Sequence, residues 1–283
     1  MPVGALVISV SVAVALSFGL ATVAPTASAP AAPPALDWEV ISRRPHDATA
    51  WTQGLQLDDD GRLYESTGLR GRSTIREVDP QTGAVLRSAP LPDEQFGEGL
   101  ALVGDRLIQL TWQEGVANTW DAATFEALGA LDFAGEGWGL CFDGQRLVMS
   151  DGSDRLTFRD PTTFEVTGSV RIEPAGLADM RLNELECVDG MVWANAWLTD
   201  TIVRIDPAAG RVTGTLDLAG LLDQAPPTDP PGPTTPPPST QPPPTTDPPD
   251  VLNGIAWDAA RGTFLVTGKL WPALFEIRVS DPG

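Results

Sequence analysis

Short apolar segments separated by tight turns recur along the chain, and the turns carry Asp or Gly. An apolar segment, such a turn and a second apolar segment together predict two antiparallel β-strands joined by a hairpin. Five copies of this unit are present: QGLQLDDDGRLYESTG from Gln53, EGLALVGDRLIQLTW from Glu98, WGLCFDGQRLVMSDG from Trp138, ELECVDGMVWANAW from Glu184 and NGIAWDAARGTFLVTGK from Asn253.

Four of the copies continue into further apolar segments around turns such as DPQTG, DPTTF and DPAAG. The copies begin 45, 40, 46 and 69 residues apart, and the longest step contains the 26-residue stretch 225–250. Without that stretch the period is nearly constant and has the length of a four-stranded propeller blade. We therefore predict an all-β fold with a single five-bladed β-propeller. A β-sandwich is the main alternative, but it offers no reason for a fixed period.

The fifth copy ends after three strands, at PALFEIRV. Its missing fourth strand has a candidate in Asp37–Arg44, within LDWEVISRR. Pairing the first strand with the last would close the ring and remove the exposed edges of an open sheet. We expect the propeller domain to span residues 37–283.

The N-terminal region has a different composition from the repeats. The chain is apolar and uncharged from Val3 to Val23, and Ala27-Ser28-Ala29 offers a small-residue cleavage site. We predict a signal peptide over residues 1–29, a Pro/Ala linker over 30–36 and a secreted, extracytoplasmic protein. The alternative is a membrane anchor, since the apolar run is long enough to span a bilayer.

The insertion 225–250 contains 13 prolines. Proline lacks a backbone donor and favours extended conformations, so the stretch cannot join a sheet. We predict a disordered Pro/Thr-rich loop with no part in the chemistry.

The net charge of −20 limits the partners of the protein. Such a surface repels phosphate backbones and anionic lipid. We expect no nucleic-acid partner, no stable membrane association once the signal peptide is cleaved, and a monomer.

Histidine and cysteine are scarce, which excludes several kinds of site. One histidine, His46, rules out a three-His zinc site, and we expect it to hold a hydrogen-bonded turn in HDATAW. Cys141 and Cys187 fall in the same register of neighbouring repeats. Inner strands of neighbouring blades are usually too far apart to bridge, so we expect two free buried thiols.

Two positions in each repeat should meet at the entrance of the central channel, because the innermost strands line it. The first position opens each inner strand: Gln53, Glu98, Trp138, Glu184 and Asn253. The second ends the next strand: Gly68, Trp112, Gly152, Trp197 and Lys269. Trp51, Phe96 and Asn183 lie beside them in sequence. Aromatic walls around a few convergent polar groups predict a small-molecule pocket.

These residues also carry a resemblance to a known family. HDATAWTQGL, FGEGLAL, EGWGLCFDGQRLVMSDGS, RLNELECVDGMVWANAW and LNGIAW…VTGKLWP are similar, in order, to the plant and bacterial type of glutaminyl-peptide cyclotransferase. The resemblance covers roughly residues 46–279. It implies a five-bladed propeller that converts N-terminal glutamine of peptides and proteins to pyroglutamate and releases ammonia. It further implies catalysis without a metal or cofactor.

Carried over by position, the resemblance implies a pocket made of nine residues of this chain: Gln53, Phe96, Glu98, Trp112, Trp138, Asn183, Trp197, Lys269 and Trp51, where the family usually has Phe. We expect Glu98 to move the proton. Lys269 and Asn183 should stabilise the oxyanion, and Gln53 should contact the substrate amide or amine. We assign substrate binding to the five aromatic side chains.

Two other functions stay open on the sequence alone. A calcium-dependent lactonase-like propeller could use Glu98, Asn183 and Asn253 as ligands, although several Trp and a Lys are poor neighbours for a metal. A non-catalytic propeller could bind small ligands or peptide N-termini in the same cage. The binding protein would release no ammonia from Gln-peptides.

Overall fold

The computed structural model describes residues 1, 4, 32–173, 180–224 and 250–283. The chain divides into two compact units, residues 1–31 and residues 32–283, and all five repeats lie in the second unit. The predicted signal peptide lies outside the described residues except for Met1 and Gly4, as does the proline-rich loop except for Asp250. Nothing in the described part of the chain forms a helix of the length and apolar character needed to cross a membrane.

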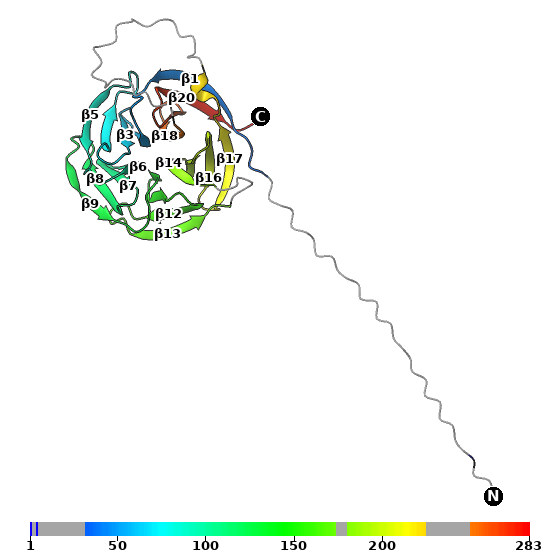
Figure 1. The fold of residues 1–283 in the computed structure, drawn as a ribbon. Helices are drawn as coiled ribbons and strands as arrows, with labels where there is room; N and C mark the ends of the chain where they lie inside the picture. The colour runs from blue at the N-terminus through cyan, green and yellow to red at the C-terminus, as the bar shows by residue number, and fades with distance from the viewer. Residues whose placement is uncertain (2–3, 5–31, 174–179, 225–249) are drawn as a thin grey trace. The chain divides into compact units, whose positions relative to one another are not determined.

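Residues 32–283 form a ring of five four-stranded antiparallel sheets in the described part of the chain (Figure 1). Blade 1 contains β2 (Thr52–Leu57), β3 (Leu63–Thr67), β4 (Thr74–Val78) and β5 (Val85–Pro90); blade 2 contains β6 (Gly97–Val103), β7 (Arg106–Thr111), β8 (Val116–Asp121) and β9 (Ala127–Asp132). Blade 3 contains β10 (Leu140–Phe142), β11 (Leu147–Ser150), β12 (Arg155–Arg159) and β13 (Val166–Arg171); blade 4 contains β14 (Leu182–Val188), β15 (Met191–Ala196), β16 (Thr201–Asp206) and β17 (Arg211–Asp217). The predicted five-bladed propeller is confirmed.

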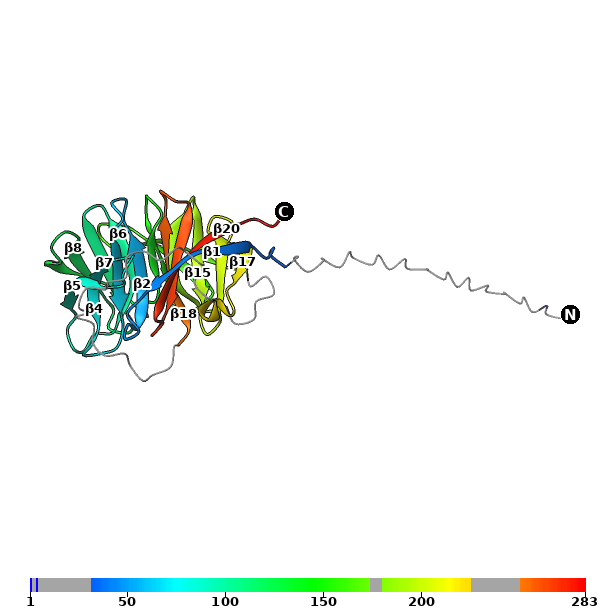
Figure 2. The same cartoon turned by 90° about the horizontal axis from the view of Figure 1, so that it is seen from above.

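Blade 5 is built from both ends of the domain. It contains β18 (Leu252–Asp258), β19 (Thr263–Gly268), β20 (Ala273–Ser280) and, as its outer strand, β1 (Asp37–Pro45). β1 pairs antiparallel with β20 from Asp37↔Ser280 to Pro45↔Ala273. In the edge-on view of Figure 2 the two strands lie side by side. The expected closure of the ring is therefore present, and a short 3₁₀ turn, η1 (Leu221–Asp223), follows blade 4.

The turn between the third and fourth strands is the same in blades 1 to 4. An Asp carboxylate accepts hydrogen bonds from the backbone N–H groups two and three residues later, as Asp79 does from Gln81 and Thr82. Asp121, Asp160 and Asp206 repeat this arrangement. Such turns explain why Asp recurs at this point of the period.

The apolar core lies between neighbouring blades. In blade 1 the inner-strand residues Leu55 and Leu57 pack against Ala256 of blade 5. Successive side chains of a strand point to opposite faces of its sheet. Leu55 and Leu57 therefore face the preceding blade, whereas the residue between them faces the following one.

This alternation explains a prediction that is wrong. Cys141 and Cys187 are not free thiols but form a disulfide, with Cα atoms 5.5 Å apart. Leu140 and Leu185 are equivalent inner-strand residues of blades 3 and 4. Cys141 lies one residue after Leu140, whereas Cys187 lies two residues after Leu185, so the two cysteines are offset by one position. The offset turns Cys141 toward blade 4 and Cys187 toward blade 3, and their inner strands are close enough near the axis to be bridged.

Candidate active site

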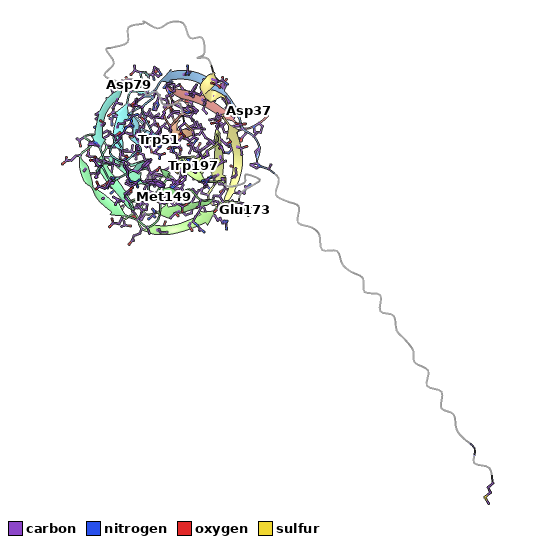
Figure 3. All side chains as sticks on the ribbon, in the orientation of Figure 1. Asp37, Trp51, Asp79, Met149, Glu173 and Trp197 are labelled. Atoms are coloured by element: carbon purple, nitrogen blue, oxygen red, sulfur yellow. A yellow bond between two sulfur atoms is a disulfide. The ribbon has the colours of Figure 1, made fainter. Side chains whose placement is uncertain are left out.

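The nine side chains assigned to the pocket line one cavity at the end of the inner strands. Its volume is about 250 Å³ and its lining is Trp51, Gln53, Phe96, Glu98, Trp112, Trp138, Asn183, Trp197 and Lys269. Trp51 and Trp197 are far apart in the sequence, and both lie near the centre of the ring (Figure 3). The closed ring thus brings together residues from all five blades and their connections.

Bulges at the start of the inner strands aim the polar groups. The pairing register shifts between Thr52 and Gly54, between Gly97 and Leu100, between Leu182 and Leu185, and between Leu252 and Ile255. Bulges of this kind redirect a side chain beside a site. Gln53, Glu98 and Asn183 occupy the irregular positions, and all three reach the cavity.

Register also corrects the predicted ring of equivalent positions in blade 4. Leu55, Leu100, Leu140, Leu185 and Ile255 are the corresponding residues, because pairing with the second strand is regular from each of them onward. The residue two before Leu185 is Asn183, not Glu184. Glu184 instead occupies the position that is glycine in the other four blades, at Gly54, Gly99, Gly139 and Gly254.

Glu184 has a structural position beside the axis rather than a place in the cavity lining. One carboxylate oxygen accepts from the N–H of Leu55 at 3.2 Å and the other from the N–H of Ile255 at 2.8 Å. Burial and the neighbouring Glu186 raise the pKa of Glu184 well above its usual range. The side chain therefore connects blade 4 to blades 1 and 5 across the axis.

Gln53 orients Glu98 within the cavity. Its Nε2 donates to Glu98 Oε1 at 2.9 Å, while its Oε1 accepts from Asn253 Nδ2 at 3.1 Å. The bond from Asn253 fixes which way the Gln53 amide points. Asn253 itself does not line the cavity. Glu98 Oε2 and Asn183 Oδ1 are buried and have no hydrogen-bond partner among the described residues, which is typical of groups with a functional role.

Burial shifts the proton affinities of Glu98 and Lys269 in opposite directions. Desolvation raises the pKa of Glu98 well above its usual range, Lys269 opposes the shift, and Glu114 and Glu136 add to it. Desolvation lowers the pKa of Lys269, and Glu98 opposes this shift. These opposite shifts bring the pKa values of the carboxyl group and the amine closer together, which favours proton exchange at the site.

The aromatic walls form edge-to-face pairs. Phe96 and Trp112 have ring centroids 5.6 Å apart, and Trp138 and Trp197 have theirs 5.2 Å apart. Lys269 Nζ lies 5.5 Å from the Trp51 ring centroid. The aromatic rings form a small apolar cage, and the polar side chains of the lining point into it.

Glycines at the ends of the second strands make room for these walls. A Cβ on Gly68 would lie 2.6 Å from Phe96 Cζ, and one on Gly152 would lie 2.5 Å from the Trp138 ring. Both glycines hold the second predicted position of their blades. Gly68 admits an aromatic side chain rather than contacting a ligand. At Gly152 the left-handed backbone, with a φ of 77°, requires glycine as well.

The residues that support the walls from outside were not predicted from the sequence. Glu136 accepts from the indole N–H groups of Trp112 and Trp138. Glu114 accepts from the Phe96 backbone N–H, and the Arg181 guanidinium lies 4.4 Å from the Trp197 ring centroid. No periodic signal marks these residues, because they lie in loops of unequal length. The only hint is that Glu136 precedes Trp138 by two residues in EGWGL.

His46 lies outside the cavity, in a buried polar network. Its Nδ1 is 2.9 Å from the Trp271 carbonyl oxygen, and its Nε2 is 3.2 Å from Glu65 Oε1. Arg76 bridges Glu65 and Asp47. These contacts agree with the structural role expected for His46.

The arrangement differs from a calcium site. Across the described ranges, no three His, Cys, Asp or Glu side chains gather as a metal-binding group. Of the three oxygen ligands that a lactonase-like site would need, Asn253 does not line the cavity, and its Nδ2 donates to Thr52 and Gln53. Its Oδ1 has no hydrogen-bond partner among the described residues. The positive charge of Lys269 would repel a cation bound beside Glu98. The donor set therefore suits an organic ligand better than a hard cation.

Comparison with known proteins agrees with this geometry. A family model described as glutamine cyclotransferase matches residues 12–279. The chain is 38% identical over 244 residues to a glutaminyl-peptide cyclotransferase of Arabidopsis thaliana, covering 86% of this chain and 71% of that protein. It is also similar to the crystal structure of Myxococcus xanthus glutaminyl cyclase, with a TM-score of 0.74 and 35% identity, over 89% of this chain and 100% of the other. The chain belongs to the glutamine cyclotransferase family.

Proposed function

We propose that this protein is a glutaminyl-peptide cyclotransferase, which converts the N-terminal glutamine of peptides and proteins to pyroglutamate and releases ammonia. The observation that carries the proposal is the aromatic cage around Glu98, whose Oε2 is buried and has no partner in the part of the chain that the structure describes. The family match and the names of the two relatives support the same activity.

The reaction is intramolecular. The α-amine attacks the side-chain amide carbon, a new C–N bond closes the ring, and the original C–N bond breaks as ammonia leaves. The enzyme must hold glutamine in the folded, attacking conformer. A narrow cage of rigid aromatic rings suits this task, since it restricts side-chain rotation and excludes water.

Glu98 serves as the proton carrier in this scheme. The amine must lose a proton before or during attack, and the leaving nitrogen must gain one. A carboxylate with a raised pKa can accept the first proton and deliver it to the leaving group. The hydrogen bond from Gln53 holds one oxygen of Glu98, which leaves Oε2 for the substrate. In this scheme Gln53 positions the Glu98 carboxylate rather than contacting the substrate directly.

Lys269 and Asn183 stabilise the oxygen of the substrate side-chain amide in this scheme. Negative charge builds on the amide oxygen as the amine attacks, and donors from Lys269 and from the Asn183 amide can stabilise it. Both side chains line the cavity and are almost fully buried, with 5% and 2% of their surface exposed. In such a site their hydrogen bonds are stronger than in water.

The reaction proceeds without a metal in our proposal. The lining contains one carboxylate, two amides and one amine among aromatic rings, and these groups cover each proton and charge in the reaction scheme. Chelators should therefore leave turnover unchanged. Loss of activity on adding a chelator, with recovery on adding a divalent metal, would contradict this part.

The protein acts outside the cytoplasm in this proposal. The apolar N-terminal run supports export, and the Cys141–Cys187 disulfide is of a kind that persists in oxidising compartments. Its partners are peptides and proteins with N-terminal glutamine, and we propose that it works as a monomer with no stable membrane association after cleavage.

The test is ammonia release from Gln-initiated peptides by the purified protein, with product mass measured in parallel. We expect wild type to turn over and Glu98→Gln to lower kcat by about 100-fold or more, since a positioned acid–base group contributes this much. The variant should unfold at a temperature close to wild type. Near-normal kcat would remove Glu98 from the proton role. Peptide binding without ammonia release by wild type would make the protein a binding propeller instead.

A further inference from the structure

Glu136 lies outside the cavity, in the connection between β9 and β10. Its Oε2 accepts from Trp112 Nε1 at 2.9 Å and from Trp138 Nε1 at 3.0 Å. Its Oε1 accepts from Gln113 Nε2 at 3.0 Å. Trp112 belongs to blade 2 and Trp138 opens blade 3, so a single carboxylate oxygen joins cage walls from two blades.

We propose that Glu136 is a positioning residue of the cage: by accepting both indole N–H groups on one oxygen, it fixes the walls of blades 2 and 3 relative to each other. The proposal rests on the proposed cyclase activity, which the cage is taken to serve.

The contacts show why one residue can control so much of the cage. Trp112 packs edge to face with Phe96, and Trp138 with Trp197. Glu136 connects these two pairs into an arc of four aromatic walls. Without it, the first pair would be held by blade 2 alone and the second by blades 3 and 4, so the gap between the pairs would no longer be fixed. A displacement of about 1 Å in a positioning group can cost about 100-fold in rate.

A carboxylate suits this place better than a neutral acceptor. Hydrogen bonds to an ionised acceptor are shorter and stronger than bonds between neutral groups. The hydrogen bond from Gln113, followed by those from the two indoles, lowers the pKa of Glu136 against the opposing effect of burial. Glu136 is therefore ionised at neutral pH.

The same charge acts on Glu98 through space. The groups that set the proton affinity of Glu98 are, after burial itself, Lys269 from the end of β19, Glu114 from the β7–β8 connection and Glu136. Glu114 also bonds Arg70, with Nε 3.1 Å from Oε1. Removing the charge of Glu136 lowers the pKa of Glu98. The activity that requires ionised Glu98 then appears at lower pH, so the acid limb of the pH profile moves down.

Three variants separate these effects. Glu136→Ala removes both indole bonds and the charge. Glu136→Gln removes the charge but keeps an oxygen that can accept both indoles. Glu165→Gln is the matched control, because it removes one negative charge from an exposed turn at the far end of blade 3. The readouts are hydrogen exchange of the Trp indole N–H groups by NMR, and kcat and KM for a Gln-peptide across the pH range.

We expect Glu136→Ala to speed exchange of two indole N–H groups and to lower kcat/KM by about 10- to 100-fold at pH values above the acid limb. Its acid limb should also move to lower pH, because the charge is lost. Glu136→Gln should restore slow exchange and most of kcat/KM while moving the acid limb to lower pH. Glu165→Gln should match wild type in every readout.

The proposal is overturned if Glu136→Ala leaves indole exchange or kcat/KM at wild-type values. An unmoved acid limb in Glu136→Gln would remove the electrostatic part. The indole exchange does not depend on turnover. If wild type releases no ammonia, the proposed activity fails, while the exchange data still decide whether Glu136 holds the two walls.

Discussion

Glu98 and Lys269 are buried together, and each limits the shift that burial imposes on the other. Burial favours the neutral form of both groups, raising the pKa of Glu98 and lowering that of Lys269. Their mutual attraction favours the charged forms. This balance keeps both groups able to change protonation state during a reaction that must move a proton from one nitrogen to another.

Lys269→Met tests this balance through the pH profile. Losing the cation removes the influence that lowers the pKa of Glu98, so this pKa rises further and the acid limb of kcat/KM moves to higher pH. Lys269→Arg keeps the charge and should leave the limb nearer its wild-type position, even if kcat falls. The check is kcat/KM for a Gln-peptide at closely spaced pH values. A limb in Lys269→Met that stays in place or moves down would contradict the coupling.

Within each blade, the ends of the hairpin strands shape the site. In blades 1, 2 and 4 a bulge at the start of the inner strand aims a polar side chain into the cavity. A residue just after the second strand either lines the cavity or leaves space for an aromatic wall. Gly68 shows the second case. Its φ is ordinary, so the reason for glycine is the close approach of Phe96 and of Trp51, whose Cδ1 would lie 3.0 Å from an added Cβ.

Gly68→Ala should therefore damage the cage more than the fold. The added methyl group displaces Phe96 or Trp51 toward the cavity, and we expect kcat/KM to fall by about 10-fold or more with a small change in thermal unfolding. Gly168→Ala is the matched control, because its Cβ would meet Phe158 at an ordinary 3.5 Å. Equal kcat/KM in Gly68→Ala and wild type would show that the walls adapt without loss.

In the described part of the ring, three features add to the apolar packing between neighbouring blades: a strand from the N-terminal side, a carboxylate across the axis and a disulfide. β1 completes blade 5 and so joins the two ends of the domain in one sheet. Glu184 connects blade 4 to blades 1 and 5. The Cys141–Cys187 bond then joins blades 3 and 4 directly.

Removing the disulfide should lower stability and leave chemistry intact. We expect Cys141→Ala combined with Cys187→Ala to reduce the free energy of unfolding by about 2–4 kcal/mol, since the cross-link restricts the unfolded chain. Neither cysteine lines the cavity, so kcat should stay close to wild type. Denaturant unfolding of the variant, of wild type and of reduced wild type is the measurement. Two free thiols titrated in unfolded, unreduced wild type would show that the bond does not form.

Much of the site is predictable because it repeats. The apolar segment that follows Gln53, Glu98 and Trp138 marks the inner strand in each blade, and Asp turns mark the outer strands. The repeat alignment puts blade 4 one residue out of register, because Glu184 stands where the other blades have glycine and resembles the polar residues of the cavity. Aligning the apolar residue Leu185 with Leu55 and Leu100 places Asn183 correctly.

The amino-acid sequence alone is enough to predict the number of blades, the closure by an N-terminal strand and the nine residues of the cavity. These follow from local strand and turn preferences repeated at a fixed period, and from the family resemblance. Three further contacts emerge only when the blades are packed together: Cys141 faces Cys187, Glu184 bonds the axis strands, and Glu136 joins Trp112 to Trp138. Each of these depends on which sheet face meets which neighbour around the ring, and that geometry is set by packing between blades rather than by any one strand.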